Sequence, residues 1–268
     1  ELAWFNLGAA YQGLKLYEKA IDAYQYAVVI DEKFDYAYRN MGDAYIRLRK
    51  YKEAIETLEK VLELTRPEEV IHEAIGHCYH RLGKHAQARF NYRKASHMNP
   101  EDSKLHYKIA LTYISEEQWS RALNSLEQAM RMHRHIPAYN LATGECYMHL
   151  EKYREAIQYF SVAVRIRSKN VSGWDSLIRC LYKAGHHEEA ARQCIAASEA
   201  TDNKPVFSFL YSAVLFALGK PKEALLQLEE GLSKTPKLVK KFIELNPSIL
   251  QNNSVVDLLA AYKKKRKI

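Results

Sequence analysis

Residues 1–34 read ELAWFNLGAAYQGLKLYEKAIDAYQYAVVIDEKF, and altered copies of this stretch follow one another along the chain. Alanine at position 20 of the stretch returns every 34 residues, at Ala20, Ala54, Ala88, Ala122, Ala156, Ala190 and Ala224. Tyrosine holds position 11 in the first five copies, and position 8 is small in six of seven. No insertion or deletion breaks this register between residues 1 and 238. An unbroken period of this length indicates a repeat architecture.

Apolar residues within each copy recur three and four residues apart over two stretches. In the first copy these residues are Leu7, Tyr11 and Leu14, followed by Ala20, Tyr24 and Ala27. The spacing predicts two antiparallel helices per copy, over positions 2–14 and 18–31, and no β-strand. Small residues at positions 8, 20 and 27 allow the two helices to approach closely. Because one helix pair cannot bury its apolar stripe alone, the pairs are expected to stack.

The pattern resembles the tetratricopeptide repeat family. In the first copy the family's conserved types stand at Trp4, Leu7, Gly8, Tyr11, Ala20, Tyr24 and Ala27. Glu32 replaces the usual proline in that copy, whereas Pro100 and Pro236 keep it in the third and seventh, and the sixth copy departs most at Ile178 and Leu181. The resemblance implies an all-α fold, a right-handed superhelical solenoid of antiparallel helix pairs.

The repeat register also predicts the domain organisation. Seven repeats are expected over residues 1–238, starting at residues 1, 35, 69, 103, 137, 171 and 205. Residues 239–268 are expected to form capping helices and a basic tail, with Ser254 as the N-cap of the last helix. The chain starts without methionine, so we interpret it as a fragment or a processed chain.

The net charge of +8 belongs mainly to the C-terminal residues. Residues 239–268 hold seven basic and two acidic side chains, leaving 33 basic and 30 acidic side chains on the repeats. The repeats therefore lack the basic excess that nucleic-acid binding requires, and no nucleic acid is expected as partner. No apolar run is long enough to span a membrane. We interpret the tail, Lys263 to Lys267, as a solvated end, with a nucleic-acid or acidic-membrane contact as the alternative.

Cysteines and histidines give no sign of a metal or catalytic site. Cys78, Cys146 and Cys180 share position 10, and with Cys194 they are expected to be buried free thiols, which suits a reducing, cytoplasmic location. His72, His77 and His80 share one helix, but no paired metal-ligand motif surrounds them, and His72 stands at a packing position. Seven of the ten glycines fall at position 8 or in the inter-helix turn, so the repeat explains them and nothing is left to build a phosphate-binding loop. Neither cofactor nor metal is expected, no small-molecule substrate is implied, and the chain is predicted not to be an enzyme.

The family resemblance places function on the concave groove, which the first helix of each repeat lines with positions 2, 5, 9, 12 and 13. Charged and aromatic residues occupy these positions in the middle repeats. The groove residues predicted to meet a partner are Arg39, Asp43, Arg47, Glu73, His77, His80, Arg81, Tyr107, Arg179 and Tyr182. The first and seventh repeats are instead apolar there, which suggests a partner or helices filling the groove. The apolar residues are Leu2, Phe5 and Ala9 in the first repeat and Val206, Phe209, Ala213 and Phe216 in the seventh.

Chaperone-binding relatives clamp a C-terminal carboxylate with Lys, Asn and Arg residues from three successive repeats, and this chain keeps only one of them. Asn40 fills the middle clamp position, but Phe5 and Ala9 precede it, and Val70 and Ala74 follow it. The predicted function is therefore a non-catalytic scaffold that binds a protein or peptide in its groove, not a carboxylate-clamp co-chaperone. Two alternatives stay open: a nucleic-acid-binding helical-repeat protein, and a docking or regulatory part of a larger enzyme.

Overall fold

The computed structural model describes residues 1–265, and within this range the chain folds into helices with no β-strand. The end of the predicted basic tail, residues 266–268, lies outside the described residues. The helices divide into two compact units, Glu1–His133 and Arg134–Ile268. Within residues 1–265 no helix combines the length and the apolar character needed to cross a membrane.

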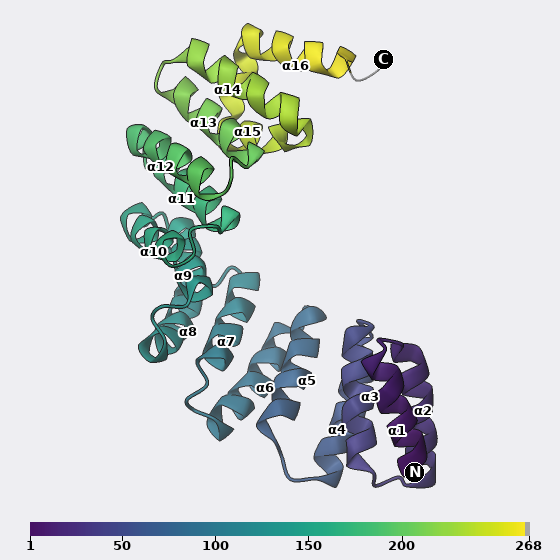
Figure 1. Cartoon of the computed structure of the whole chain (residues 1–268). Helices are drawn as coiled ribbons and strands as arrows, with labels where there is room; N and C mark the ends of the chain where they lie inside the picture. The colour runs from purple at the N-terminus through teal and green to yellow at the C-terminus, as the bar shows by residue number, and fades with distance from the viewer. Residues whose placement is uncertain (266–268) are drawn as a thin grey trace. The chain divides into compact units, whose positions relative to one another are not determined.

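Unit 1 holds four helix pairs, and the two helices of each pair lie antiparallel (Figure 1). The first helices of the pairs are α1 (Leu2–Gly13), α3 (Asp35–Arg47), α5 (Glu69–Arg81) and α7 (Ser103–Ser115). The second helices are α2 (Tyr17–Ile30), α4 (Tyr51–Leu64), α6 (His85–Met98) and α8 (Trp119–Met132). Within the unit, α2 packs on α3, α4 on α5 and α6 on α7, so the pairs stack as predicted.

Unit 2 holds three more pairs and a C-terminal segment of short helices. The first helices of these pairs are α9 (Pro137–His149), α11 (Val171–Lys183) and α13 (Pro205–Ala217). Their second helices are α10 (Tyr153–Ile166), α12 (His187–Ala200) and α14 (Pro221–Lys234). The C-terminal segment consists of η1 (Pro236–Leu238), α15 (Val239–Leu245), η2 (Pro247–Gln251) and α16 (Asn253–Lys265). All fourteen predicted repeat helices are present, and each begins and ends within about one residue of its predicted bounds.

Each pair closes around the small residues that define the repeat. The alanine at position 20 is fully buried in all seven repeats. A Cβ atom added to Gly8, Gly76 or Gly144 would lie within 2.5–2.7 Å of the aromatic ring at position 24 of the same repeat. Because such a distance is far below van der Waals contact, glycine at position 8 is what lets the first helix lie against that ring.

One turn geometry joins the two helices in every repeat. Position 15 has a positive φ, between 56° and 78°, at Lys15, Arg49, Gly83, Glu117, Glu151, Gly185 and Gly219. The amide of position 16 then donates a hydrogen bond of 2.9 Å to the carbonyl of position 11, for example from Leu16 to Tyr11. This bond closes a Schellman motif, which ends the first helix and reverses the chain.

The C-terminal segment packs on the last repeat. Helix α15 lies on α13, and α16 contacts α14. Phe242 of α15 is fully buried, as is Val255 of α16. The prediction that Ser254 caps α16 was wrong by two residues: the Asn252 side chain accepts a hydrogen bond from the Ser254 amide at 3.0 Å, and the helix starts at Asn253.

Candidate functional site

Eight of the ten predicted groove residues lie in unit 1, on α3, α5 and α7. They stand at positions 5, 9, 12 and 13 of their repeats, and residues at such three- and four-residue spacings share one side of a helix. We call this side of the three helices, at positions 2, 5, 9, 12 and 13, the first-helix face of unit 1. The remaining two predicted residues, Arg179 and Tyr182, lie on α11 of unit 2.

Helix α3 contributes one arginine that is already paired and one that is open to solvent. Arg39 donates to both carboxylate oxygens of Glu68 at 2.6 Å and to Asp35 at 3.1 Å. These hydrogen bonds, chiefly the one to Glu68, raise the pKa of Arg39. Arg47 lies 3.6 Å from Asp43, and its side chain is 61% exposed. Arg39 therefore ties α3 to Glu68, the residue just before α5, whereas Arg47 can bind a carboxylate from outside.

Asp43 lies between Arg47 and the preceding repeat. Its carboxylate accepts a hydrogen bond of 2.8 Å from the Gln12 side-chain amide on α1. Gln12 in turn accepts a bond of 2.8 Å from the Tyr24 hydroxyl. These hydrogen bonds, which link Tyr24 through Gln12 to Asp43, hold the Asp43 carboxylate in place. Asp43 therefore orients Arg47 and is not a free acceptor for a partner.

Helix α5 contributes a histidine beside two basic residues. Half-buried His77 meets the Tyr51 ring edge-on at 6.2 Å, and Arg81 lies 5.6 Å from the same ring. Burial lowers the pKa of His77, and the nearby charges of Lys108 and Arg81 lower it further. His77 is therefore neutral near pH 7, so the exposed Arg81 carries the positive charge at this place.

His80, one turn further along α5, already has a hydrogen-bond partner within the chain. Its Nδ1 lies 3.3 Å from Nδ1 of His85 on α6. Burial lowers the pKa of His80, and the neighbouring His85 adds to the effect. Two imidazoles sharing one hydrogen bond cannot both be charged there without repulsion, so His80 contributes a polar rather than a strongly charged group to the face.

Helix α7 adds an apolar group with one ion pair beside it. Tyr107, Leu111 and Ile114 are each half-buried. Lys108, next to Tyr107, forms an ion pair with Glu73 of α5. Lys108 stands at position 6, outside the predicted set, so the sequence pattern gave no signal for this pair. Its effect is to neutralise the charge of Glu73 beside the apolar residues of α7.

The face of unit 2 differs, because the chain's own α15 lies on it. Arg179 bonds Asp175 at 3.0 Å and reaches the Lys241 carbonyl at 3.4 Å and Glu244 at 3.7 Å. The prediction placed Arg179 on a face open to a partner; instead its side chain is held by α15 and is 18% exposed. Tyr182 lies 4.9 Å from the ring of His187.

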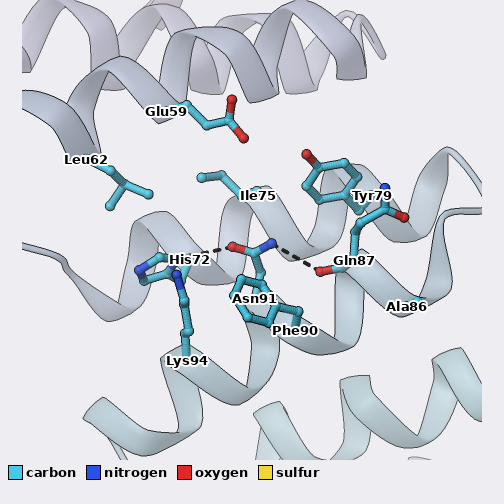
Figure 2. A pocket seen from close by; sticks show the side chains of 10 residues that line it. All are labelled: Glu59, Leu62, His72, Ile75, Tyr79, Ala86, Gln87, Phe90, Asn91 and Lys94. Atoms are coloured by element: carbon cyan, nitrogen blue, oxygen red, sulfur yellow. Dashed lines mark hydrogen bonds between the residues drawn. The ribbon is translucent and has the colours of Figure 1, made fainter.

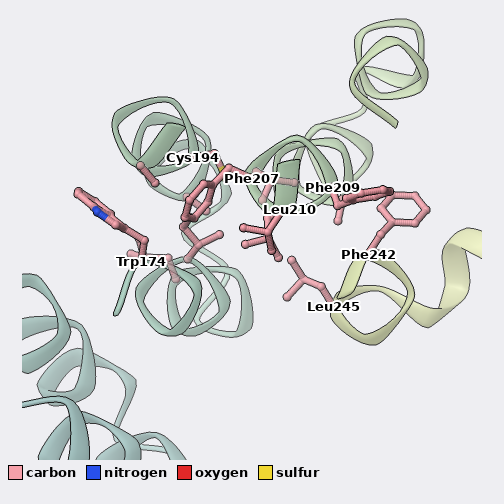
Figure 3. Close-up of a cluster of buried hydrophobic side chains, with 14 of the residues drawn as sticks. Trp174, Cys194, Phe207, Phe209, Leu210, Phe242 and Leu245 are labelled. Carbon is pink, nitrogen blue, oxygen red and sulfur yellow. The ribbon is translucent and has the colours of Figure 1, made fainter. Parts of the chain in front are cut away.

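The apolar positions of the seventh repeat are covered by the same helix. Val206, Phe209 and Ala213 are buried, and Phe216 meets the Phe242 ring at 6.2 Å. Figure 3 shows Phe242 and Leu245 of α15 on the side of α13 where Phe209 and Leu210 lie. Of the two explanations that the sequence offered for these residues, helices filling the face is the one observed.

A second surface lies away from the first-helix face, between α4, α5 and α6. A pocket of about 470 Å³ is lined there by residues of all three helices, including His72, Asn91 and the exposed Phe90 (Figure 2). His72 is buried, and its Nδ1 lies 3.2 Å from Asn91 Oδ1, which confirms that it is a packing residue. The Asn91 amide donates to the Gln87 carbonyl at 3.1 Å. In the sequence, this pocket is indicated only by Phe90, an aromatic residue at position 22 of its repeat.

The remaining titratable clusters have simple structural roles. All four cysteines are buried and free, as predicted, and burial raises the pKa of the Cys78 and Cys146 thiols to about 12. Such thiols are unreactive near neutral pH. Carboxylate oxygens of Glu69, Glu73 and Asp102 lie within 4.8 Å of one another at the start of α5 and α7. One member of this acidic cluster, Glu73, is the ion-pair partner of Lys108.

Comparison with known proteins agrees with the fold. The family model of the tetratricopeptide repeat protein 21 C-terminal ARM domain matches residues 9–141, and a tetratricopeptide repeat model matches residues 138–170. No curated protein matches the sequence. The chain belongs to the tetratricopeptide repeat family, with seven tandem repeats.

Solved structures of three other proteins illustrate the likeness. The C-terminal part of a repeat protein from Cytophaga hutchinsonii superposes with a TM-score of 0.73 at 15% identity, over 95% of this chain and 99% of that one. A repeat protein from Parabacteroides merdae gives 0.65 at 15% identity, over 91% and 97%. YrrB, described as having an unusual peptide-binding site, gives 0.56 at 19% identity, over 63% and 88%. At these identities the likenesses show the fold alone, a helical array of tetratricopeptide repeats.

Proposed function

We propose that the chain is a non-catalytic scaffold that binds a protein or peptide segment on the first-helix face of unit 1. The observation that carries this proposal is the arrangement of α3, α5 and α7: Arg47 and Arg81 are exposed, and the half-buried apolar residues of α7 lie on the same side. Exposed arginines bind carboxylates in bidentate fashion. An acidic and partly apolar segment is therefore the ligand that this face fits.

Two features argue against the alternatives. A carboxylate clamp needs basic residues at positions where this chain has Phe5 and Val70, so a C-terminal carboxylate finds no clamp on α1 and α5. A nucleic-acid ligand needs a continuous basic stripe, but Arg39 and Lys108 are both neutralised by glutamates. A docking role within a larger enzyme is compatible with the same face, because such a role is also binding of a protein segment.

The experiment that tests the proposal compares capture of partner proteins by four forms of the chain. The wild type and the Arg47→Glu/Arg81→Glu variant are the main pair. Arg49→Glu/Arg66→Glu is the matched control, because it makes the same charge change at two exposed arginines off the face. The fourth form lacks residues 263–268.

We expect the partner to bind the wild type, the control and the truncated chain, and to be lost from Arg47→Glu/Arg81→Glu. Circular dichroism and the melting curve should be unchanged in that variant, because both arginines are exposed. Affinity should fall with added salt, since the contacts are partly solvated. Normal binding by the face variant together with loss on tail deletion would move the site to the C-terminus and overturn the proposal.

A further inference from the structure

Helix α15 is the chain's own example of a segment bound on a first-helix face. It lies on α13 with Phe242 fully buried and Leu245 nearly so. Glu244, two residues after Phe242, lies 3.7 Å from Arg179 at position 9 of the sixth repeat. Lys241 lies 3.3 Å from Asp175 at position 5 of that repeat. The segment bound on this face therefore has two apolar residues three positions apart. One carboxylate lies between them in the sequence, and a lysine precedes them.

Residues of similar chemistry occupy the same register positions in unit 1. Glu73 stands where Asp175 stands, at position 5, and His77 stands where Arg179 stands, at position 9. In the following repeat Tyr107, Leu111 and Ile114 correspond to Phe209, Ala213 and Phe216. Acid, base and apolar group thus recur in the same order on α5 and α7. These apolar residues of α7 are half-buried, whereas Phe209 and Ala213 are fully buried beneath their repeat's own covering.

One difference between the α5–α7 face and the α11–α13 face decides which residues a bound segment needs. In unit 2 the cation that pairs with the position-5 acid comes from the occupant, as Lys241. In unit 1 that cation is already present, because Lys108 of α7 pairs with Glu73. Arg81 adds an exposed positive charge one turn beyond His77. An occupant of unit 1 therefore needs no lysine at this place, and a carboxylate is favoured near Arg81.

We propose that the α5–α7 part of the first-helix face binds a short amphipathic helix of a partner protein that resembles α15 without its lysines. The partner helix presents two bulky apolar residues three apart to Tyr107, Leu111 and Ile114, and one or more carboxylates toward Arg81. This inference rests on the proposed function and names the class of partner. The mode is a helix laid on a helical face by its apolar residues.

The test uses the full chain and synthetic peptides in trans. Three peptides are needed: residues 236–252, the same peptide with Lys240→Glu and Lys241→Glu, and that acidic peptide with Phe242→Ala. Binding is measured by fluorescence anisotropy, and the bound segment by hydrogen exchange with mass spectrometry. The chain's own α15 is not displaced at micromolar peptide, because its tethering gives it an effective concentration of about 1 mM or more.

The acidic peptide is expected to bind more tightly than the original, by about threefold or more from the added carboxylates near Arg81. Its Phe242→Ala form is expected to lose at least about tenfold in affinity, because a central aromatic anchor dominates such contacts. Exchange should slow in α5 and α7. Leu111→Glu in the chain should abolish binding, whereas Phe90→Glu, the same kind of change off the face, should not.

Several results would overturn the inference: no binding by any peptide, preference for the original peptide, or slowed exchange in α11 and α13 instead. If Leu111→Glu lowers the melting temperature, Arg81→Glu serves instead, because it is exposed and should remove the preference for the acidic peptide. The proposed function is tested separately. If a partner still depends on Arg47 and Arg81 while the peptides fail, only the helical class of partner is wrong.

Discussion

The α5–α7 face and the α11–α13 face occupy the same register positions, yet only the second is covered by the chain itself. On α13 the face positions of the repeat are apolar, and Phe242 of α15 packs on this face, where Phe209 and Ala213 are fully buried. On α7 the corresponding residues are half-buried beside charged groups of α5. The apolar α13 face is covered by a helix of the chain itself, whereas the mixed face of α5 and α7 is the one on which we propose that a partner binds.

The largest expected effect is on the covered face. Phe242→Ala removes a fully buried ring between α15 and α13, and it should lower the stability of unit 2 by about 3–5 kcal/mol. Denaturant unfolding and hydrogen exchange of α13 and α15 measure this loss. Exchange in α5 and α7 of unit 1 should stay as in the wild type. A variant as stable as the wild type would show that α15 is not a permanent cover.

A smaller loss is expected from overfilling the contact inside a helix pair, equally in both units. Ala88 of unit 1 and Ala156 of unit 2 are fully buried at position 20. Replacing either by Leu should cost about 1–3 kcal/mol, because the extra methyl groups have no space. Energies in stacked repeats act mainly between neighbours, so adjacent repeats should loosen first. Unchanged melts of both variants would mean that position 20 does not set the helix approach.

A dependence on pH should mark unit 1. Burial is the largest cause that lowers the pKa of His77, His80 and His106. A histidine whose pKa is lower in the folded chain takes up its proton more readily when unfolded, so stability falls as pH drops below about 6.5. Chemical denaturation across about pH 7.5 to 5.5 measures the slope. His77→Gln should flatten it, and an equal slope in that variant would remove His77 from the explanation.

The smallest expected change is a gain in stability at the inter-helix turn. Glu117 and Glu151 adopt the left-handed conformation that Gly83 and Gly185 adopt in other repeats. Glycine relieves about 1–2 kcal/mol of strain there and loses about 0.5–1 kcal/mol more chain entropy, so each change to Gly should stabilise by about 0.5 kcal/mol. Thermal unfolding of both variants checks this, with Gly83→Ala as the opposite control. A loss of stability in Glu117→Gly would contradict the assigned turn.

The sequence predicted the repeat and its helices because a fixed period leaves small and apolar residues at fixed places. It also predicted buried thiols and the packing role of His72. It did not predict the turn conformation of Lys15 or Glu117, because neither residue type favours a positive φ.

Side-chain contacts that the family pattern does not describe were also missed. The pairing of Glu73 with Lys108 depends on position 6, which the family pattern does not place on the face. The contact of Arg179 with α15 involves a segment outside the register, although apolar Phe209 and Phe216 did indicate that something covers the seventh repeat.

Hydrogen exchange of the full chain, with and without its captured partner, would locate the binding surface. We expect slower exchange in α3, α5 and α7, with the second helices of those repeats little changed. Slower exchange confined to residues 253–265, or to α4 and α6 around the pocket of Figure 2, would contradict the proposal.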